Sequence, residues 1–481
     1  MRLHSILRAV PFLAATLVLA LAGCESLRQL KLGIEALTSK VKPDYDVVEA
    51  DRERQRGPEE ASDLTLENSD FWTGFRGPIR DGNYSDRPVR LDWPAEGLPV
   101  VWRQPIGGGY SSFAIAQGLA YTLEQRREQE TVVAYELTTG REVWTYTYDA
   151  RFSEAFSGEG PRATPTYTAG RLYSVGATGE VHCLDAVNGD LIWRRNVLVD
   201  TGAENLNYGV SASPLVSSEM VIVIAGAGTD KNSVVAYELE TGDVLWSALP
   251  EEAAYASPMK VHLGGRDQIL VATANRVVGL DPYRGELLWE YPWQVFSGLA
   301  CAQPVLVDGN RVFVSGSYGA GCALLQIGAP EAAVATAADS EGDNETAPSA
   351  LPLTARLVWE NKTLRNKFNS SIYYNGHLYG LDEGIFVCLD AETGKRRWKG
   401  GRYGYGQVTL VGEHLIVSGG KGDLALLRAT PERHEELARF NVFKGNSWTP
   451  PALASSLLVM RNAAEMVCLD LRIDSESSES P

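Results

Sequence analysis

Short apolar stretches recur along most of the chain, and each is followed by the same spaced set of residues. An apolar run, such as 132–135 or 181–184, ends in an acid; after three further residues comes a glycine, and after three more a tryptophan. Apolar runs on both sides of a glycine are typical of a β-hairpin, since glycine adopts the positive φ that tight turns need. The five full copies are Glu136-Gly140-Trp144, Asp185-Gly189-Trp193, Glu238-Gly242-Trp246, Asp281-Gly285-Trp289 and Asp390-Gly394-Trp398.

A second hairpin precedes each of these units, so each repeat is expected to hold four strands. A period of roughly 45 residues with four strands per repeat is typical of a β-propeller blade. In five repeats the first strand opens beside a proline, at Thr164-Pro165, Ser213-Pro214, Ser257-Pro258, Gln303-Pro304 and Thr449-Pro450. The aromatic residues that close successive repeats are Trp102, Trp144, Trp193, Trp246, Trp289, Trp359, Trp398 and Phe440.

These repeats predict an all-β, eight-bladed propeller over residues 99–472. The closing aromatics lie 42, 49, 53, 43, 70, 39 and 42 residues apart, and the 70 becomes 43 once residues 328–354 are set aside as a disordered insertion in blade 5. Blades 5 and 7 are degenerate, because Gln326 and Arg428 stand in place of the acid. A seven-bladed ring is the alternative, should the repeat around Arg428 not form a blade.

The two ends of the repeat region complete each other. The strand around Trp102 has no repeat before it, whereas the last repeat ends at Asp470 without a fourth strand. Pairing of residues 99–105 with the C-terminal strands would close the ring and remove its exposed sheet edges. We therefore predict closure of the last blade by this N-terminal strand, with a disordered tail over residues 473–481.

The N-terminal segment has a different pattern. Arg2 and Arg8 precede an apolar run over residues 9–22. The run is too short to span a bilayer, and together with the basic residues it indicates a signal peptide over residues 1–23. The run ends in the sequence LAGC at Cys24, which resembles the lipobox of bacterial lipoproteins, where the cysteine is acylated. The lipid on Cys24 is then expected to be the only attachment to a membrane.

Residues 24–70 are expected to form a lipidated N-terminus and a flexible tether, because residues 42–70 are polar and acidic with few aromatics. Residues 71–98 are expected to form a lead-in segment. This organisation predicts a protein of the cell envelope that faces the periplasm, with the outer membrane favoured over the inner.

Composition excludes several partner classes. The chain has 44 basic and 61 acidic residues, and loss of Arg2 and Arg8 with the signal peptide leaves 42 and 61, a formal charge of −19. Such a charge argues against nucleic acid and anionic lipid headgroups. Besides Cys24 there are five cysteines and no CxxC motif, which favours buried free thiols; a Cys301–Cys322 disulfide is the alternative.

The repeat unit resembles the repeat of pyrroloquinoline-quinone (PQQ) dehydrogenases, and eight copies in a lipoprotein are similar to the BamB family of outer-membrane assembly lipoproteins. The resemblance covers residues 99–472 and is specific for fold rather than activity. The quinoprotein enzymes hold PQQ against a disulfide between adjacent cysteines, with calcium bound nearby. No adjacent cysteines occur in this chain and no calcium ligands can be mapped, so no catalytic, cofactor or metal residue is carried over.

Residues that recur in every blade are expected to be scaffold, since a ring has at most one axial site. The acid should cap its hairpin turn and the tryptophan should pack between blades. Function is expected where the symmetry breaks, at the connections that enter the innermost strands and line the axial funnel. The residues there are Tyr110, Arg162, Tyr255, Phe368, Asn369, Tyr405 and Trp448.

An aromatic funnel with one arginine suits a protein segment or a glycan. The alternative is that these residues only close the top of the core. The sequence therefore predicts a non-catalytic, membrane-anchored scaffold that binds envelope or outer-membrane proteins, or glycans, without a cofactor. The rival hypothesis is an enzyme: a divergent PQQ- and calcium-dependent dehydrogenase or a sugar-acting propeller.

Overall fold

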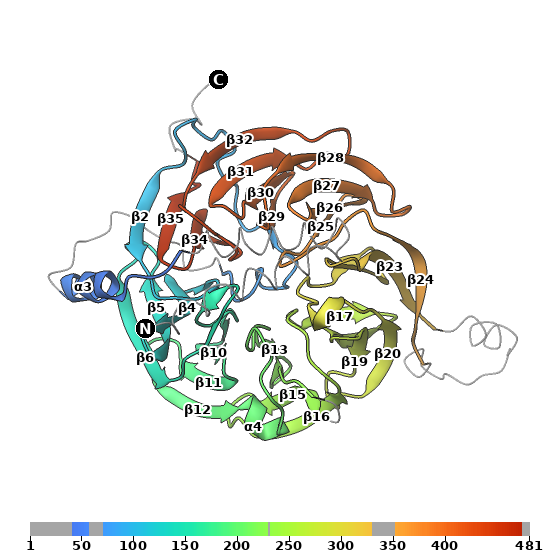
Figure 1. The fold of residues 1–481 in the computed structure, drawn as a ribbon, viewed down its shortest axis with the longest axis horizontal. Helices are drawn as coiled ribbons and strands as arrows, with labels where there is room; N and C mark the ends of the chain where they lie inside the picture. The colour runs from blue at the N-terminus through green and yellow to red at the C-terminus, as the bar shows by residue number, and fades with distance from the viewer. Residues whose placement is uncertain (1–40, 57–70, 229–230, 330–351, 474–481) are drawn as a thin grey trace, which may run out of the picture.

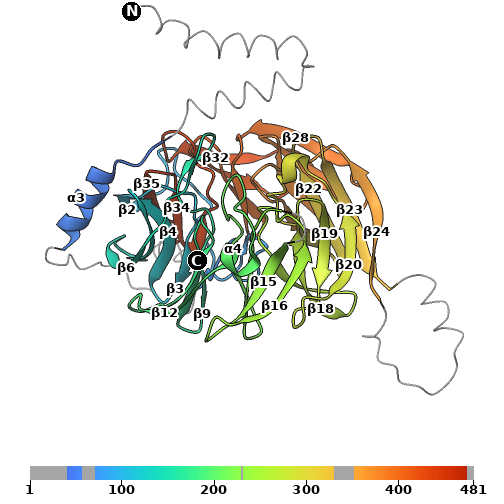
Figure 2. The same cartoon turned by 60° about the horizontal axis from the view of Figure 1, so that its bottom comes forward.

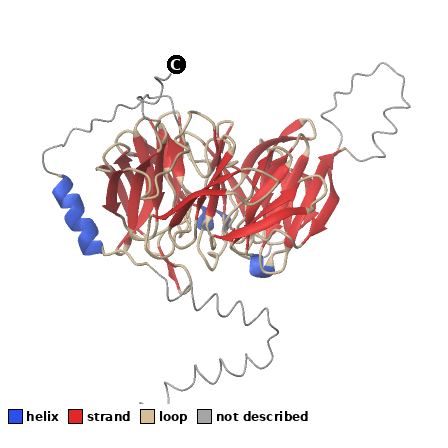
Figure 3. Cartoon of the chain, turned by 90° about the horizontal axis from the view of Figure 1, so that it is seen from above, coloured by secondary structure: helices blue, strands red, loops and turns tan. Residues whose placement is uncertain are grey.

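Eight antiparallel sheets are arranged as blades around a central axis (Figure 1). The structure is a computed structural model that describes residues 41–56, 71–228, 231–329 and 352–473. Seen edge-on, the blades stand side by side in one ring, with helix α3 (Tyr45–Gln55) outside it (Figure 3). The predicted eight-bladed propeller is confirmed. Cys24, the tail from residue 474 and most of the insertion lie outside the described residues.

Each blade has four main strands, counted outward from the axis. The first strands are β3 (Ala114–Ala116), β9 (Thr166–Thr168), β13 (Leu215–Ser217), β17 (Met259–Leu263), β21 (Val305–Val307), β25 (Ile372–Tyr374), β29 (Gln407–Val411) and β33 (Ala452–Ala454). The second strands are β4 (Leu119–Arg126), β10 (Arg171–Val175), β14 (Met220–Ile224), β18 (Arg266–Ala272), β22 (Arg311–Gly316), β26 (His377–Asp382), β30 (His414–Ser418) and β34 (Leu457–Arg461).

The third strands are β5 (Gln129–Glu136), β11 (Glu180–Asp185), β15 (Asn232–Glu238), β19 (Arg276–Leu280), β23 (Gly321–Gly328), β27 (Ile385–Asp390), β31 (Asp423–Arg428) and β35 (Glu465–Asp470). The outermost strands are β6 (Glu142–Asp149), β12 (Leu191–Asn196), β16 (Val244–Pro250), β20 (Leu287–Pro292), β24 (Thr354–Asn361), β28 (Arg396–Arg402), β32 (Glu436–Asn441) and β2 (Val100–Pro105). The second and third strands are largely buried because neighbouring blades cover both of their faces.

Blades 7 and 8 settle the two open points of the ring. Blade 7 is complete, with β29 to β32 in order, so the seven-bladed alternative is wrong. Strand β2 pairs antiparallel with β35, with Trp102 opposite Cys468, and closes the last blade as predicted. The strands that flank the predicted insertion end at Gly328 and begin at Thr354, and these two residues are paired.

The repeated residues join each blade to the next. The carboxylate of Asp185 accepts hydrogen bonds from the backbone N–H groups of Val187 and Asn188 and so caps its turn. The turn glycine has positive φ and no room for a side chain, because a Cβ on Gly242 would lie 2.7 Å from the ring of Trp193 in the blade before it. The Trp193 Nε1–H also donates to Leu239 O at 3.0 Å. Acid, glycine and tryptophan are therefore scaffold, as predicted.

The prediction that Phe440 closes blade 7 is wrong, because the closing position lies two residues earlier. Phe440 pairs with Leu424, whereas the position that tryptophan occupies in other blades is held by Ala438, opposite Leu426 and beside the same β-bulge. The ring of Phe440 instead packs edge-on against Trp93 of the lead-in segment, with centroids 5.8 Å apart. Spacing alone could not place the aromatic, because the longer turn before β32 shifts the register.

The prediction of a flexible tether over residues 24–70 is wrong for helix α3 (Tyr45–Gln55), which begins after the N-cap residue Asp44. The helix lies against the outer edge of the ring beside β2 (Figure 2). Arg52, only 7% exposed, forms an ion pair with Glu142 of blade 1 and donates to Pro105 O of β2, so the helix spans the seam where the ring closes. The sequence did not predict this contact, because the residues that the helix buries are charged and its segment is polar.

Two further helical turns lie in the connections: α4 (Val197–Thr201) and η1 (Phe296–Gly298). Two short strands, β7 (Ser153–Glu154) and β8 (Gly158–Glu159), form a small hairpin before β9. Among the described residues, none of the helices combines the length and apolar character needed to cross a membrane.

Candidate functional site

Hydrogen bonds between blades form a polar ring around the axis, at the start of the innermost strands. The backbone N–H of Ser112 donates to Thr164 Oγ1, that of Thr164 to Ser213 Oγ, and that of Ser213 to Ser257 Oγ, at 2.9 to 3.2 Å. Gln407 continues the ring by donating to Trp448 O at 2.7 Å. The connections just before these residues must therefore meet at one end of the axis, which we call the mouth.

Four of the predicted residues form one aromatic cluster at the mouth. Trp448 stacks on Tyr110 with ring centroids 5.5 Å apart, and Phe368 lies 5.3 Å from Trp448 and 5.7 Å from Tyr405. These residues come from the connections into blades 8, 1, 6 and 7, so the cluster joins four blades. All four rings are half-buried, and burial raises the pKa of Tyr110 to about 12. The cluster presents aromatic surface with phenol and indole groups at its edges.

Lys367 lies among these rings, although the sequence analysis did not predict it as a site residue. Its Nζ is 4.3 Å from the ring centroid of Tyr405 and 5.2 Å from those of Phe368 and Tyr318. Burial lowers the pKa of Lys367, while the electron-rich ring faces favour its charged form. Its position next to Phe368 was the available signal, but the charge pattern gives no reason to single out one lysine.

The other three predicted residues make contacts of other kinds. Tyr255 packs edge-on against Tyr208 at 5.7 Å. Arg162 forms an ion pair with Glu154 and lies 4.8 Å over the ring of Phe152, and burial lowers its pKa. Asn369 is 1% exposed and accepts the backbone N–H of Lys367, so it shapes the loop instead of presenting a polar group at the surface.

Two exposed phenylalanines stand in connections of the same kind. Phe156, in the connection into blade 2, is 53% exposed, and Phe296, in the connection into blade 5, is 69% exposed. Phe296 lies 6.4 Å from Tyr318, which contacts Lys367 of the mouth. Exposed phenylalanine costs solvation free energy and is common at protein-binding surfaces. The sequence could not distinguish these residues from buried ones.

The lead-in segment passes through the centre of the ring of blades (Figure 1). Trp72 forms a bridge with Ile115 of blade 1, and β1 (Asn83–Tyr84) pairs in parallel with the end of β29 in blade 7. Arg80 is 4% exposed and donates to the carbonyl oxygens of Ser213 and Pro258. Because one segment contacts opposite blades, it holds the ring together.

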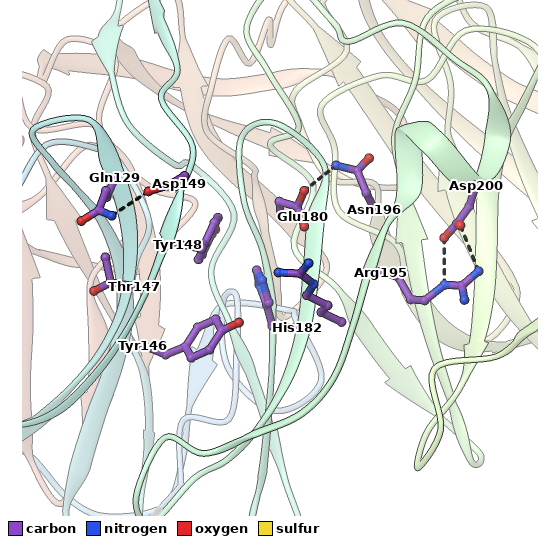
Figure 4. Close-up of a pocket in the computed structure, with 11 residues that line it drawn as sticks. Gln129, Tyr146, Thr147, Tyr148, Asp149, Glu180, His182, Arg195, Asn196 and Asp200 are labelled. Atoms are coloured by element: carbon purple, nitrogen blue, oxygen red, sulfur yellow. Dashed lines mark hydrogen bonds and ion pairs between the residues drawn. The ribbon is translucent and has the colours of Figure 1, made fainter.

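A groove of about 750 Å³ lies away from the axis, between the outer parts of blades 1 and 2 (Figure 4). Tyr146 and Tyr148 of β6 form one wall, and His182 of β11 lies 5.1 and 4.4 Å from their ring centroids. Burial lowers the pKa of His182 to about 3, so its ring is neutral at physiological pH.

A buried carboxyl supports the groove from behind. Glu130 is fully buried; it accepts the hydroxyl of Tyr148 at 2.7 Å and the backbone N–H of Ala177 at 3.1 Å. Residue 176 must be glycine, because a Cβ there would lie 2.2 Å from Glu130 Oε2. Burial raises the pKa of Glu130 from 4.5 to about 7.

The raised pKa makes stability depend on pH. A carboxyl that ionises less readily when folded favours the native state below its unfolded pKa, and this contribution is lost as the pH rises from about 4.5 through 7. We expect Glu130→Gln to remove that decline, leaving the variant more stable than the wild type by roughly 3 kcal/mol at pH 8 and similar to it at pH 4. Urea denaturation across this pH range measures the difference, with the exposed Glu128→Gln as control. An unchanged pH profile in the Glu130 variant would contradict the assignment.

The described part of the chain holds no group of three or more His, Cys, Asp or Glu side chains placed to bind a metal ion. All five described cysteines are free thiols, so the Cys301–Cys322 disulfide does not form. Cys301 is half-buried, and burial raises its pKa to about 12.

Comparisons with known proteins agree on the fold. A family model described as "Outer membrane protein assembly factor BamB" matches residues 128–400. Among solved structures, BamB from Moraxella catarrhalis is similar with a TM-score of 0.55 at 16% identity, covering 78% of this chain and 98% of that one. No curated protein matches the sequence.

Two other solved structures are comparably similar. The quinohemoprotein alcohol dehydrogenase from Comamonas testosteroni has a TM-score of 0.56 at 11% identity, covering 91% of this chain and 83% of its own. The computationally designed protein Ika8 has a TM-score of 0.51 at 11% identity, covering 76% and 98%. At such identities a structural likeness shows the fold alone.

Proposed function

We propose that this protein is a non-catalytic scaffold that binds envelope proteins at its aromatic mouth. It belongs to the family of the outer membrane protein assembly factor BamB, because the model of that family matches more than half of the chain. The observation that carries the proposal is the cluster of Tyr110, Phe368, Tyr405 and Trp448, which no blade repeats and which joins four blades.

The chemistry of the mouth favours a protein segment over a glycan. Phe156 and Phe296 expose purely apolar rings, which gain little from hydroxyl groups but bury well against apolar side chains. Aromatic residues are enriched where partners anchor, because a rigid ring buries a large area at low entropic cost. Lys367 adds one cation that can meet a carboxylate or carbonyl group of the partner.

The lipobox at Cys24 supports a lipid anchor, and membership in the family supports a place on the periplasmic side of the outer membrane. Mass spectrometry of the mature N-terminus tests the anchor, because an unacylated Cys24 would contradict it. An acidic surface is compatible with protein partners and disfavours nucleic acid.

The double variant Tyr405→Ala/Trp448→Ala tests the mouth. We expect it to fold and to lose partner capture by roughly thirtyfold or more, since loss of a hot-spot aromatic costs about 2 kcal/mol of binding. The measurement is a quantitative pull-down of solubilised outer-membrane proteins, normalised to folded bait. Capture equal to that of the wild type would refute a role for the mouth. Dye reduction by the purified protein supplied with PQQ and calcium would instead favour the dehydrogenase hypothesis.

A further inference from the structure

The groove between blades 1 and 2 breaks the symmetry of the repeat as clearly as the mouth does. His182 precedes the residue that pairs with the blade's tryptophan, and its register partner is Arg194. In each of the other seven blades this position holds a small aliphatic residue. Those residues are Val133, Val235, Val278, Ala323, Val387, Ala425 and Val467.

A histidine at this position is costly for the fold. The ring of His182 is 1% exposed and its Nδ1 has no hydrogen-bond partner among the described residues. An unpartnered buried polar group is unfavourable by roughly 1 to 3 kcal/mol, which valine would avoid. Because the ring packs against Tyr146 and Tyr148 in the lining of the groove, support of that wall accounts for its presence.

The groove walls carry paired polar groups that are held in place (Figure 4). Asn196 donates to Glu180 at 2.9 Å, and Gln129 donates to Asp149 at 2.7 Å. A further ion pair joins Arg195 to Asp200 at 2.9 Å. The tyrosine wall is equally fixed, since Glu130 accepts the hydroxyl of Tyr148 from behind. The groove is therefore preorganised, with most of its side chains oriented before any ligand arrives.

The composition of the lining selects the ligand class. None of the lining residues is aliphatic; they are Gln129, Tyr146, Thr147, Tyr148, Asp149, Glu180, His182, Arg194, Arg195, Asn196 and Asp200. An apolar peptide would find few apolar partners, and a strongly charged polymer would meet groups of its own sign, because both arginines and carboxylates are present. Hydroxyl groups both donate and accept hydrogen bonds, which suits amides, carboxylates and guanidinium groups together.

We propose that this groove binds an uncharged saccharide, with a sugar ring against Tyr146 and its hydroxyl groups bonded to the polar walls. The volume of about 750 Å³ lies within the roughly 300–1,000 Å³ of small-ligand sites and admits a short oligosaccharide. The ligand is either a free oligosaccharide or a segment of an envelope polysaccharide, which share this chemistry. The site is separate from the mouth and does not depend on the function proposed there.

Isothermal titration with maltotetraose, cellotetraose and tetra-N-acetylchitotetraose tests the proposal. We expect at least one of these uncharged probes to bind, and both Tyr146→Ala and Arg194→Ala to weaken that binding by about tenfold or more. Tyr291→Ala is the matched control, because Tyr291 holds the same position in blade 4, two residues after Trp289, and should leave binding unchanged. Tyr146→Phe keeps the ring and should retain most of the affinity.

Three results would overturn the proposal: no binding of any probe at millimolar concentrations, binding that survives both groove substitutions, or tighter binding of an acidic probe such as tetragalacturonate. Co-sedimentation with insoluble envelope polysaccharide, competed by the probe that binds, distinguishes a polymer from a free sugar. The Tyr405→Ala/Trp448→Ala variant should keep saccharide binding, so failure at the groove and failure at the mouth are distinguishable.

Discussion

A chain that begins at residue 106 should lose cooperative unfolding, whereas a chain that begins at residue 99 should keep it. The shorter chain lacks β2, so β35 becomes an exposed edge and the ring opens between blades 8 and 1. It also lacks Trp102, whose ring packs over Gly140 and whose Nε1–H donates to Leu137 O. Thermal unfolding followed by circular dichroism measures the difference.

The chain from residue 99 is the matched control, because both truncations remove α3 and the lead-in segment. It should melt at a lower temperature than the full chain, since it lacks the buried Arg80 and its bonds to the inner strands. Its transition should nevertheless remain single and steep. Equal melting of the two truncated chains would show that β2 does not close the ring.

Trp193→Ala should destabilise the propeller by roughly 3 to 5 kcal/mol, as a large-to-small change in a core. The ring of Trp193 is 7% exposed and lies between Tyr173 and Tyr237, with centroids 6.0 and 6.2 Å away. Its loss removes the contact with Gly242 of the next blade and leaves Leu239 O without its indole donor. The free energy of unfolding in urea measures the cost.

Leu191→Ala is the control for this substitution, because Leu191 lies on the same strand and is 43% exposed. It should change stability by no more than about 0.5 kcal/mol. If Trp193→Ala were equally mild, or if it stayed fully folded and lost its partner, the tryptophan would belong to the binding site and not to the scaffold.

Repetition explains which parts of the fold could be predicted from the sequence. The pattern around Asp185, Gly189 and Trp193 recurs because every blade meets its neighbour in the same way, so one interpretation applied to all copies. Closure by β2 followed from the missing fourth strand of the last repeat. The predicted register of blade 7 was wrong, because Ala438 stands at the closing position and Phe440 packs on the lead-in segment instead.

The contacts that were missed join residues far apart in the chain. Arg52 lies in a polar segment, and only the structure shows that Glu142 and Pro105 surround it. The mouth could be predicted from sequence position alone, because every connection into an innermost strand ends at the same side of the ring. This is why Tyr110, Phe368, Tyr405 and Trp448 were predicted to lie together. It could not find Lys367 or the exposure of Phe296, which depend on loop conformation.

Site-specific photo-crosslinking tests whether this scaffold meets its protein partner at the mouth. A photoreactive amino acid is placed at Phe156, at Phe296 or at Tyr283, which is 64% exposed in the turn between β19 and β20. After irradiation of intact cells, we expect a discrete protein adduct from Phe156 and Phe296 and none from Tyr283. An adduct from Tyr283 alone would contradict it.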